Sequence, residues 1–282
     1  MRPLTIDTVL IATDLSADDV PAMRTAMELS RLAGAQLHVV HAGSRRDPDL
    51  KQRLDDHIRS ADPASAILPG STIRTGRADR VVTEVAEMIN ADVVVLGPHR
   101  HGRSRSLGGT AYMVAANAER PCLVLPAAMH LPLGRILIPI DASGAARGAL
   151  EVGLTWASAL RRRRPAGTGD ATGILVLNVV LPGSDGEAAA QELMKSALSA
   201  VGERVTAAAG VAVECATIQA SDASVAILER AAAEDIDLIV LGTRGRGSTA
   251  GELGSVSAAV VEDAVSPLLL VPPRVWRHEE DS

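Results

Sequence analysis

Two segments of this sequence have the residue types and spacing that bind phosphate groups. Each contains a glycine, Gly97 or Gly242, followed twelve positions later by a second glycine and a hydroxyl residue, Gly109-Thr110 or Gly254-Ser255. Glycine lets the backbone approach an anion closely. A helix that begins at the second glycine offers free N–H groups and a positive partial charge, and its first hydroxyl residue can cap it. Both segments therefore predict phosphate-binding loops.

An aspartate follows the first apolar run of each half of the chain. In the segment 8–16 the apolar run ends at Asp14, and in the segment 135–143 it ends at Asp141. Each aspartate precedes a serine by two positions. Ligands of open parallel sheets bind beyond the carboxyl ends of the strands. We therefore expect a nucleotide with its base near the aspartate and its phosphates along the glycine-containing loop. Two alternatives stay open: the aspartates only cap a turn, and the glycines only serve turn geometry.

The two halves are copies of one domain. Three pairs of segments match in the same order: 8–16 with 135–143, 91–110 with 236–255, and 120–126 with 266–273. Repeats of this kind indicate a duplicated unit. Pro and Gly between residues 127 and 134 mark the boundary. We expect a first domain over 1–128, a second over 133–275 and a tail over 276–282.

Apolar runs alternate with helical patterns in each half. In the first half we expect strands over 8–13, 35–42, 71–76, 92–97 and 122–126, and helices over 21–34, over 79–90 and from Thr110. The second half repeats the series, with 171–180, 211–219, 224–234 and 238–242 in the corresponding places. Continuous Val, Leu and Ile runs between helices predict parallel strands covered on both faces. The fold class is therefore α/β, as two tandem open-sheet sandwich domains of five parallel strands each.

Composition excludes several classes of function. Aromatic residues make up 1% of the chain and the formal net charge is −6, so neither base stacking nor attraction to nucleic acid or anionic membranes is expected. The sequence offers no apolar stretch long enough to cross a membrane. Its two cysteines form no metal or disulfide pattern, and His99 and His101 have no third ligand nearby. We expect a cytoplasmic protein with no metal site and no catalytic residues.

Both halves resemble domains of the universal stress protein family, over almost the whole chain. The ATP-binding branch of that family carries G-x2-G-x9-G-[ST] after the fourth strand. In the second half Gly242 and Gly245 match the opening and Gly254-Ser255 the close, with eight residues between them rather than nine. In the first half Arg100 stands where the second glycine belongs. The resemblance implies an adenine nucleotide α-hydrolase-like fold.

The resemblance also implies a ligand and its contacts. It implies ATP or another adenine nucleotide, with the need for Mg²⁺ left open, in the second half. The implied ATP-binding residues are Pro139, Asp141, Val179, Gly242, Arg244, Gly245, Gly254, Ser255 and Val256. The equivalent, degenerate site of the first half would comprise Asp14, Ala42, Gly97, His99, Arg100, Gly109 and Thr110.

The resemblance further implies a stress-response regulatory or signalling module with at most weak ATP hydrolysis. The alternative is a stress or interaction protein that binds no nucleotide. Single-domain members of the family are often dimers that pair their fifth strands. By resemblance, residues 122–126 and 268–272 are expected to pair within this chain as a built-in pseudo-dimer. The whole chain could pair again as a homodimer.

Overall fold

Runs of Val, Leu and Ile form the strands, because such side chains suit a sheet that is covered on both faces. The computed structural model describes residues 5–44, 47–64, 69–98, 109–126, 128–141, 143–162, 173–180, 211–244 and 252–273, with 182, 192, 194–196 and 199. The elements of the first half are β1 (Thr8–Ala12), the 3-10 helix η1 (Ala17–Asp19), α1 (Val20–Ala33), β2 (Gln36–Ala42), α2 (Leu50–Ala61), β3 (Gly70–Arg74), α3 (Ala78–Met88), β4 (Val93–Leu96), α4 (Gly109–Asn117) and β5 (Cys122–Val124). Those of the second half are β6 (Arg135–Pro139), α5 (Gly144–Arg162), β7 (Gly173–Val180), β8 (Ala212–Gln219), α7 (Ala223–Ala233), β9 (Leu238–Gly242), α8 (Ser255–Asp263) and β10 (Leu268–Val271).

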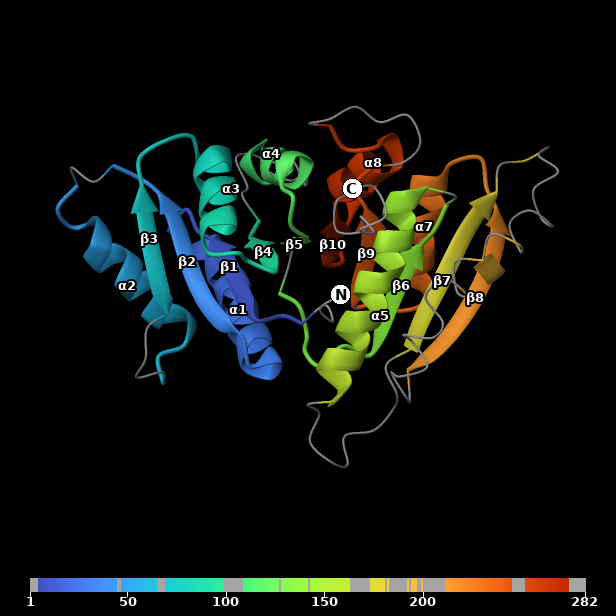
Figure 1. Cartoon of the computed structure of the whole chain (residues 1–282), viewed down its shortest axis with the longest axis horizontal. Coiled ribbons are helices and arrows are strands. Elements are labelled where there is room, and N and C mark those ends of the chain that lie inside the picture. The colour runs from blue at the N-terminus through green and yellow to red at the C-terminus, as the bar shows by residue number, and fades with distance from the viewer. Residues whose placement is uncertain are drawn as a thin grey trace, which may run out of the picture.

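The described strands form one ten-stranded sheet in the order β3-β2-β1-β4-β5-β10-β9-β6-β7-β8 (Figure 1). Neighbouring strands within each half are parallel. The predicted α/β class with five parallel strands in each half is confirmed. In each half the strand order reverses beside the first strand, β1 or β6. Such a reversal is the switch point at which open parallel sheets bind ligands.

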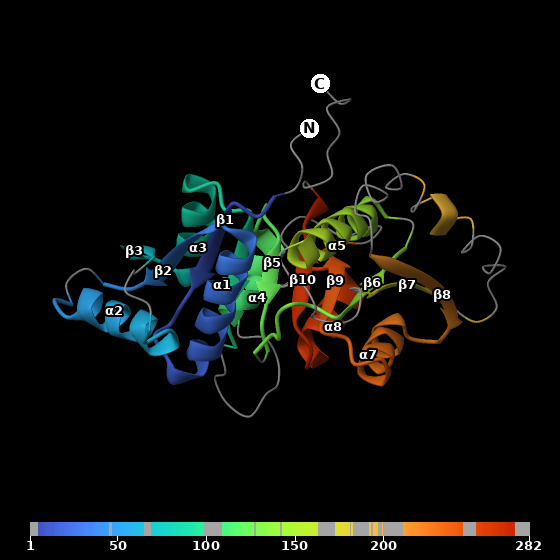
Figure 2. The same cartoon turned by 90° about the horizontal axis from the view of Figure 1, so that it is seen from below.

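The two halves meet where β5 and β10 pair antiparallel. Leu268, Leu269 and Leu270 lie opposite Val124, Leu123 and Cys122, and Figure 2 shows the two strands side by side in the middle of the molecule. The predicted pairing within the chain is therefore confirmed. It covers two apolar strand edges that would otherwise invite aggregation.

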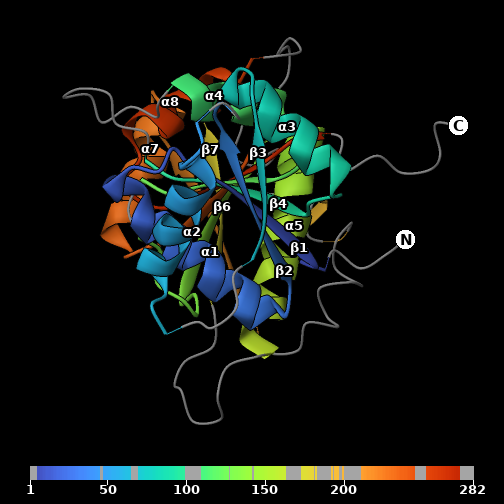
Figure 3. The same cartoon turned by 90° about the vertical axis from the view of Figure 1, so that its left-hand side faces the viewer.

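Two apolar cores lie on opposite faces of the sheet. Side chains alternate along β1, so that Val9 and Ile11 join one core and Leu10 the other. The first core includes buried residues of α1, α2 and α5, and the second includes buried residues of α3, α4, α7 and α8. Both cores continue across the β5–β10 pair, where Leu123 and Leu269 belong to the first. The halves therefore share their cores, and Figure 3 shows how the strands cross as the sheet twists.

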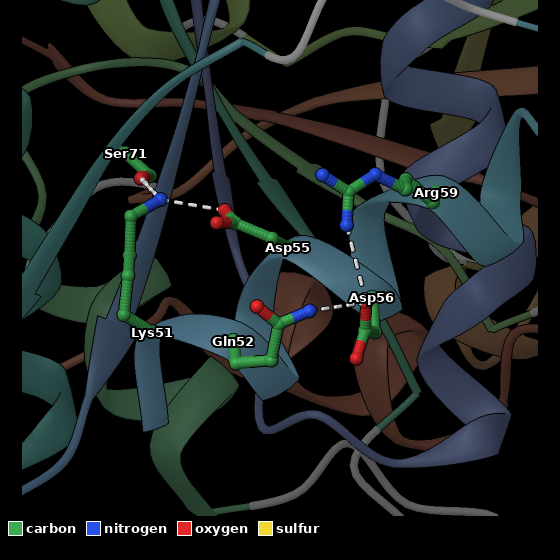
Figure 4. A network of polar contacts seen from close by, with 6 residues as sticks. All are labelled: Lys51, Gln52, Asp55, Asp56, Arg59 and Ser71. Atoms are coloured by element: carbon green, nitrogen blue, oxygen red, sulfur yellow. Dashed lines mark hydrogen bonds and ion pairs between the residues drawn. The ribbon is translucent and has the colours of Figure 1, made fainter. Parts of the chain in front are cut away.

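Helix α2 is an element that the sequence analysis did not predict. Its segment is rich in charged residues, but Leu54 and Ile58 are buried on one face. On the exposed side, the Lys51 ammonium donates to Asp55 and, over 3.2 Å, to the Ser71 hydroxyl of β3 (Figure 4). Lys51 thereby ties α2 to the outermost strand of the first half. No helix in the described part of the chain is long and apolar enough to span a membrane.

Candidate functional site

A cavity of about 490 Å³ lies in the second half, where the carboxyl ends of β6, β7 and β9 meet the start of α8. Small-molecule sites typically measure about 300–1,000 Å³. Its lining includes most of the residues that the sequence analysis assigned to a nucleotide: Pro139, Asp141, Val179, Gly242, Arg244, Gly254, Ser255 and Val256. Gly245, the remaining one, lies outside the described residues. The fold thus brings together segments that are more than one hundred positions apart.

Asp141 lies at the carboxyl end of β6 and turns the chain into α5. Its Oδ1 accepts a hydrogen bond from the Ser143 backbone N–H over 2.9 Å, and the Ser143 hydroxyl accepts one from the Ala146 N–H over 3.2 Å. These bonds cap the turn and the first turn of the helix. The turn-capping alternative is therefore present in the structure. The exposed carboxylate also lies on the cavity wall, so capping and ligand contact are compatible.

The sequence analysis missed Asn178, which also lines the cavity. Its buried side-chain amide donates to the Ile140 backbone carbonyl over 2.8 Å and so joins β7 to the end of β6. In the first half His41 Nδ1 makes the same link to the Thr13 carbonyl, also over 2.8 Å. The signal was a single polar residue inside the apolar run of 173–180. A buried polar side chain requires a partner, and the partner here is a backbone atom.

The ends of the second-half loop are fastened together. The Gly254 N–H donates to the Thr243 carbonyl over 2.8 Å, and the Ser257 hydroxyl donates to the Gly242 carbonyl over 2.7 Å. Gly242 serves close packing, because a Cβ at this position would lie 2.7 Å from the backbone carbonyl carbon of Ala145 in α5. The glycine therefore sets the approach of α5 to β9. Gly242 does not adopt a left-handed backbone conformation, so the position does not need glycine for that purpose.

The start of α8 forms one wall of the cavity. Gly254 is the N-cap residue and has no side chain, so the side-chain cap that the sequence analysis expected from Ser255 is absent. Ser255 and Val256 belong to the first turn and line the cavity. The first N–H groups of a helix have no partner within the helix and carry a positive partial charge. This wall therefore favours an anionic ligand group. Arg244 adds a full positive charge to the lining.

The corresponding cavity of the first half is smaller, at about 170 Å³. Four residues predicted for this site line it: Asp14, Ala42, Gly109 and Thr110. Gly97 lies at the end of β4 and packs against Asp19. A Cβ added to Gly97 would lie 2.1 Å from Oδ1 of Asp19. The predicted His99 and Arg100 lie outside the described residues. The volume falls below the usual range of about 300–1,000 Å³ for small-molecule sites.

A family profile matches both halves of the chain. The profile described as the universal stress protein family matches residues 5–126 and 132–272. The chain belongs to the universal stress protein family. It contains two tandem domains of this family, as the sequence analysis predicted. No curated protein matches the chain.

Solved structures show the same fold over nearly the whole length. A universal stress protein from Archaeoglobus fulgidus DSM 4304 is 16% identical, with a TM-score of 0.70 over 97% of this chain and 100% of that chain. A functionally unknown protein from Pseudomonas aeruginosa PAO1 is 16% identical, with a TM-score of 0.64 over 96% of this chain and 94% of that chain. Among the described residues, no group of three or more His, Cys, Asp or Glu residues is placed to hold a metal ion.

Proposed function

We propose that this universal stress protein binds an adenine nucleotide, ATP, in the cavity of its second half. On this proposal it acts as a cytoplasmic regulatory or signalling module of a stress response and not as an enzyme. The observation that carries the proposal is the set of residues that line this one cavity. The lining combines Asp141, Arg244 and the start of α8. It also includes Gly242 and Gly254, near the two ends of a loop that a backbone hydrogen bond from Gly254 to Thr243 holds together.

The lining suits a ligand with a flat apolar end and an anionic end. Leu177, Val179 and Ile227 offer apolar surface from β7 and α7, whereas Arg244 and the start of α8 follow β9. Strand β6 lies between β7 and β9, so the two ends are about two strand spacings apart, roughly 10 Å. A nucleobase at one end and phosphates at the other fit this arrangement.

We further propose that one nucleotide binds per chain, because the first-half cavity is about one third of the volume of the other. The two aspartates provide a matched pair of variants. Asp14 Oδ1 accepts from the Ser16 N–H over 2.8 Å, as Asp141 Oδ1 accepts from the Ser143 N–H over 2.9 Å. Alanine at either position therefore removes the same turn contact, but only Asp141→Ala alters the larger cavity.

The experiment identifies any nucleotide released from the denatured protein and titrates ATP into the purified chain by calorimetry. We expect about one ATP per chain, with Asp141→Ala weakening binding about 10- to 100-fold, the factor for losing a hydrogen bond with a charged group. Asp14→Ala should bind as the unaltered chain does. Equal losses in both variants would contradict a site confined to the second half. Absence of binding would overturn the proposal and favour a nucleotide-independent interaction protein.

A further inference from the structure

Arg244 links the cavity of the second half to a helix of the first half. Its Nη2 donates to the Ala116 backbone carbonyl over 3.1 Å, across 128 positions of sequence. Ala116 is buried in the last turn of α4. The final carbonyls of a helix lack partners within the helix and carry a negative partial charge, so a guanidinium there is a favourable cap. Figures 1 and 3 show α4 beside α8, the helix that follows the loop of Arg244.

Helix α4 connects this contact to the other cavity. Its first residues, Gly109 and Thr110, line the cavity of the first half, and Ala116 lies at its opposite end. A helix of nine residues is about 13 Å long. Arg244 and the first-half cavity therefore lie at the two ends of one rigid element.

Arg244 has hydrogen-bonding capacity that this contact does not use. A guanidinium carries five N–H donors, and the buried Nε of Arg244 has no hydrogen-bond partner among the described residues. Because Arg244 lines the larger cavity, an anionic ligand there can supply acceptors. Hydrogen bonds between a guanidinium and a phosphate are stronger than those between neutral groups.

We propose that Arg244 bridges a bound phosphate group in the second half to the C-terminal end of α4, so that nucleotide binding orders α4 and the first-half cavity at its other end. This inference rests on the proposed nucleotide site. Arg244 keeps its bond to Ala116 and donates to the ligand with its remaining N–H groups. It thus acts as a positioning residue between the two halves.

The test is hydrogen exchange of the backbone amides of α4 in the full chain, with calorimetry of ATP on the same samples. Arg24 provides the matched control, because its Nε donates to the Ala61 carbonyl at the end of α2 over 3.3 Å and it lines neither cavity. Both Arg244→Ala and Arg24→Ala remove a guanidinium from a helix C-terminus. Adenosine, which has no phosphate, is the second probe beside ATP.

Without ligand, we expect Arg244→Ala to speed exchange in residues 109–118 about two- to fivefold, the factor for one charge at a helix end. Arg24→Ala should leave this segment unchanged. ATP should slow exchange of the same segment in the unaltered chain and in Arg24→Ala, but not in Arg244→Ala, and adenosine should have no such effect.

Unchanged or faster exchange of α4 on binding of ATP would overturn the bridge. An ATP effect that persists in Arg244→Ala, or that adenosine reproduces, would overturn it as well. If calorimetry detects no ATP binding to the unaltered chain, the proposed nucleotide site fails and the bridge fails with it. In that case the ligand-free comparison of the two variants still shows whether Arg244 caps α4.

Discussion

Gly242→Ala tests whether a single glycine sets the distance between α5 and the sheet. A Cβ at this position would lie 2.7 Å from the carbonyl carbon of Ala145 and 2.8 Å from its Cβ and carbonyl oxygen. Two of these atoms belong to the backbone, so no side-chain rotation relieves the clash and α5 must shift away from β9. Overpacking of this kind costs about 1–3 kcal/mol. Alanine also restricts the unfolded chain, which returns about 0.4–1 kcal/mol.

We therefore expect Gly242→Ala to lower the free energy of unfolding by on the order of 1–2 kcal/mol, measured by urea denaturation. Gly109→Ala is the control, because a Cβ there meets no atom within 4 Å, and its stability should equal or exceed that of the unaltered chain. Gly242→Ala should also weaken ATP binding, since Ser143 and Ala146 near the start of α5 line the cavity. Unchanged stability of Gly242→Ala would refute the close-packing explanation.

Three further predictions concern the core, the thiols and the cavity wall. Leu269→Ala, at a fully buried position of the β5–β10 pair, should cost about 2–5 kcal/mol in urea denaturation; a loss below about 1 kcal/mol would contradict the tight packing there. Burial raises the pKa of the Cys122 thiol to about 12. Partial desolvation and the neighbouring Glu214 carboxylate also raise the pKa of the Cys215 thiol, but this side chain is exposed to the reagent. Because the thiolate is the reactive form, mass spectrometry should find one alkylated cysteine per native chain at pH 8 and two after denaturation; two in the native chain would show that Cys122 is accessible. Asn178→Leu leaves the Ile140 carbonyl without its side-chain donor and should cost about 1–3 kcal/mol, with weaker ATP binding; full stability would mean that this hydrogen bond is dispensable.

The strands and the repeat could be predicted because their signals are local. Runs such as 92–97 and 238–242 contain the apolar residues that a doubly covered sheet needs. The end of the first helix was equally readable, because Gly34 adopts the left-handed conformation that ends α1. Helix α2 was missed because polar and charged residues outnumber apolar ones in its segment, although the buried residues Leu50, Leu54, Ile58 and Ala61 recur at the spacing of an amphipathic helix.

The candidate site could be predicted in its members but not in its connections. Asp141 and Gly242 were found from repeated motifs, and the structure places both in the lining of one cavity. The packing role of Gly242 depends on where α5 crosses β9, which no local pattern encodes. The hydrogen bond from Arg244 to the carbonyl of Ala116 depends on how the two halves dock. Because the acceptor is a backbone carbonyl, which every residue has, no residue type in the sequence marks it.

The antiparallel pair β5–β10 joins two unequal halves within one polypeptide. In a symmetric homodimer every substitution appears in both subunits, so both ligand cavities must change together. Here the halves are connected covalently, so their pairing is intramolecular, with an effective concentration of roughly millimolar order for a short linker. The pairing therefore survives dilution. One half can change its cavity, as the difference between about 170 and 490 Å³ illustrates, while the other half and the shared interface stay the same.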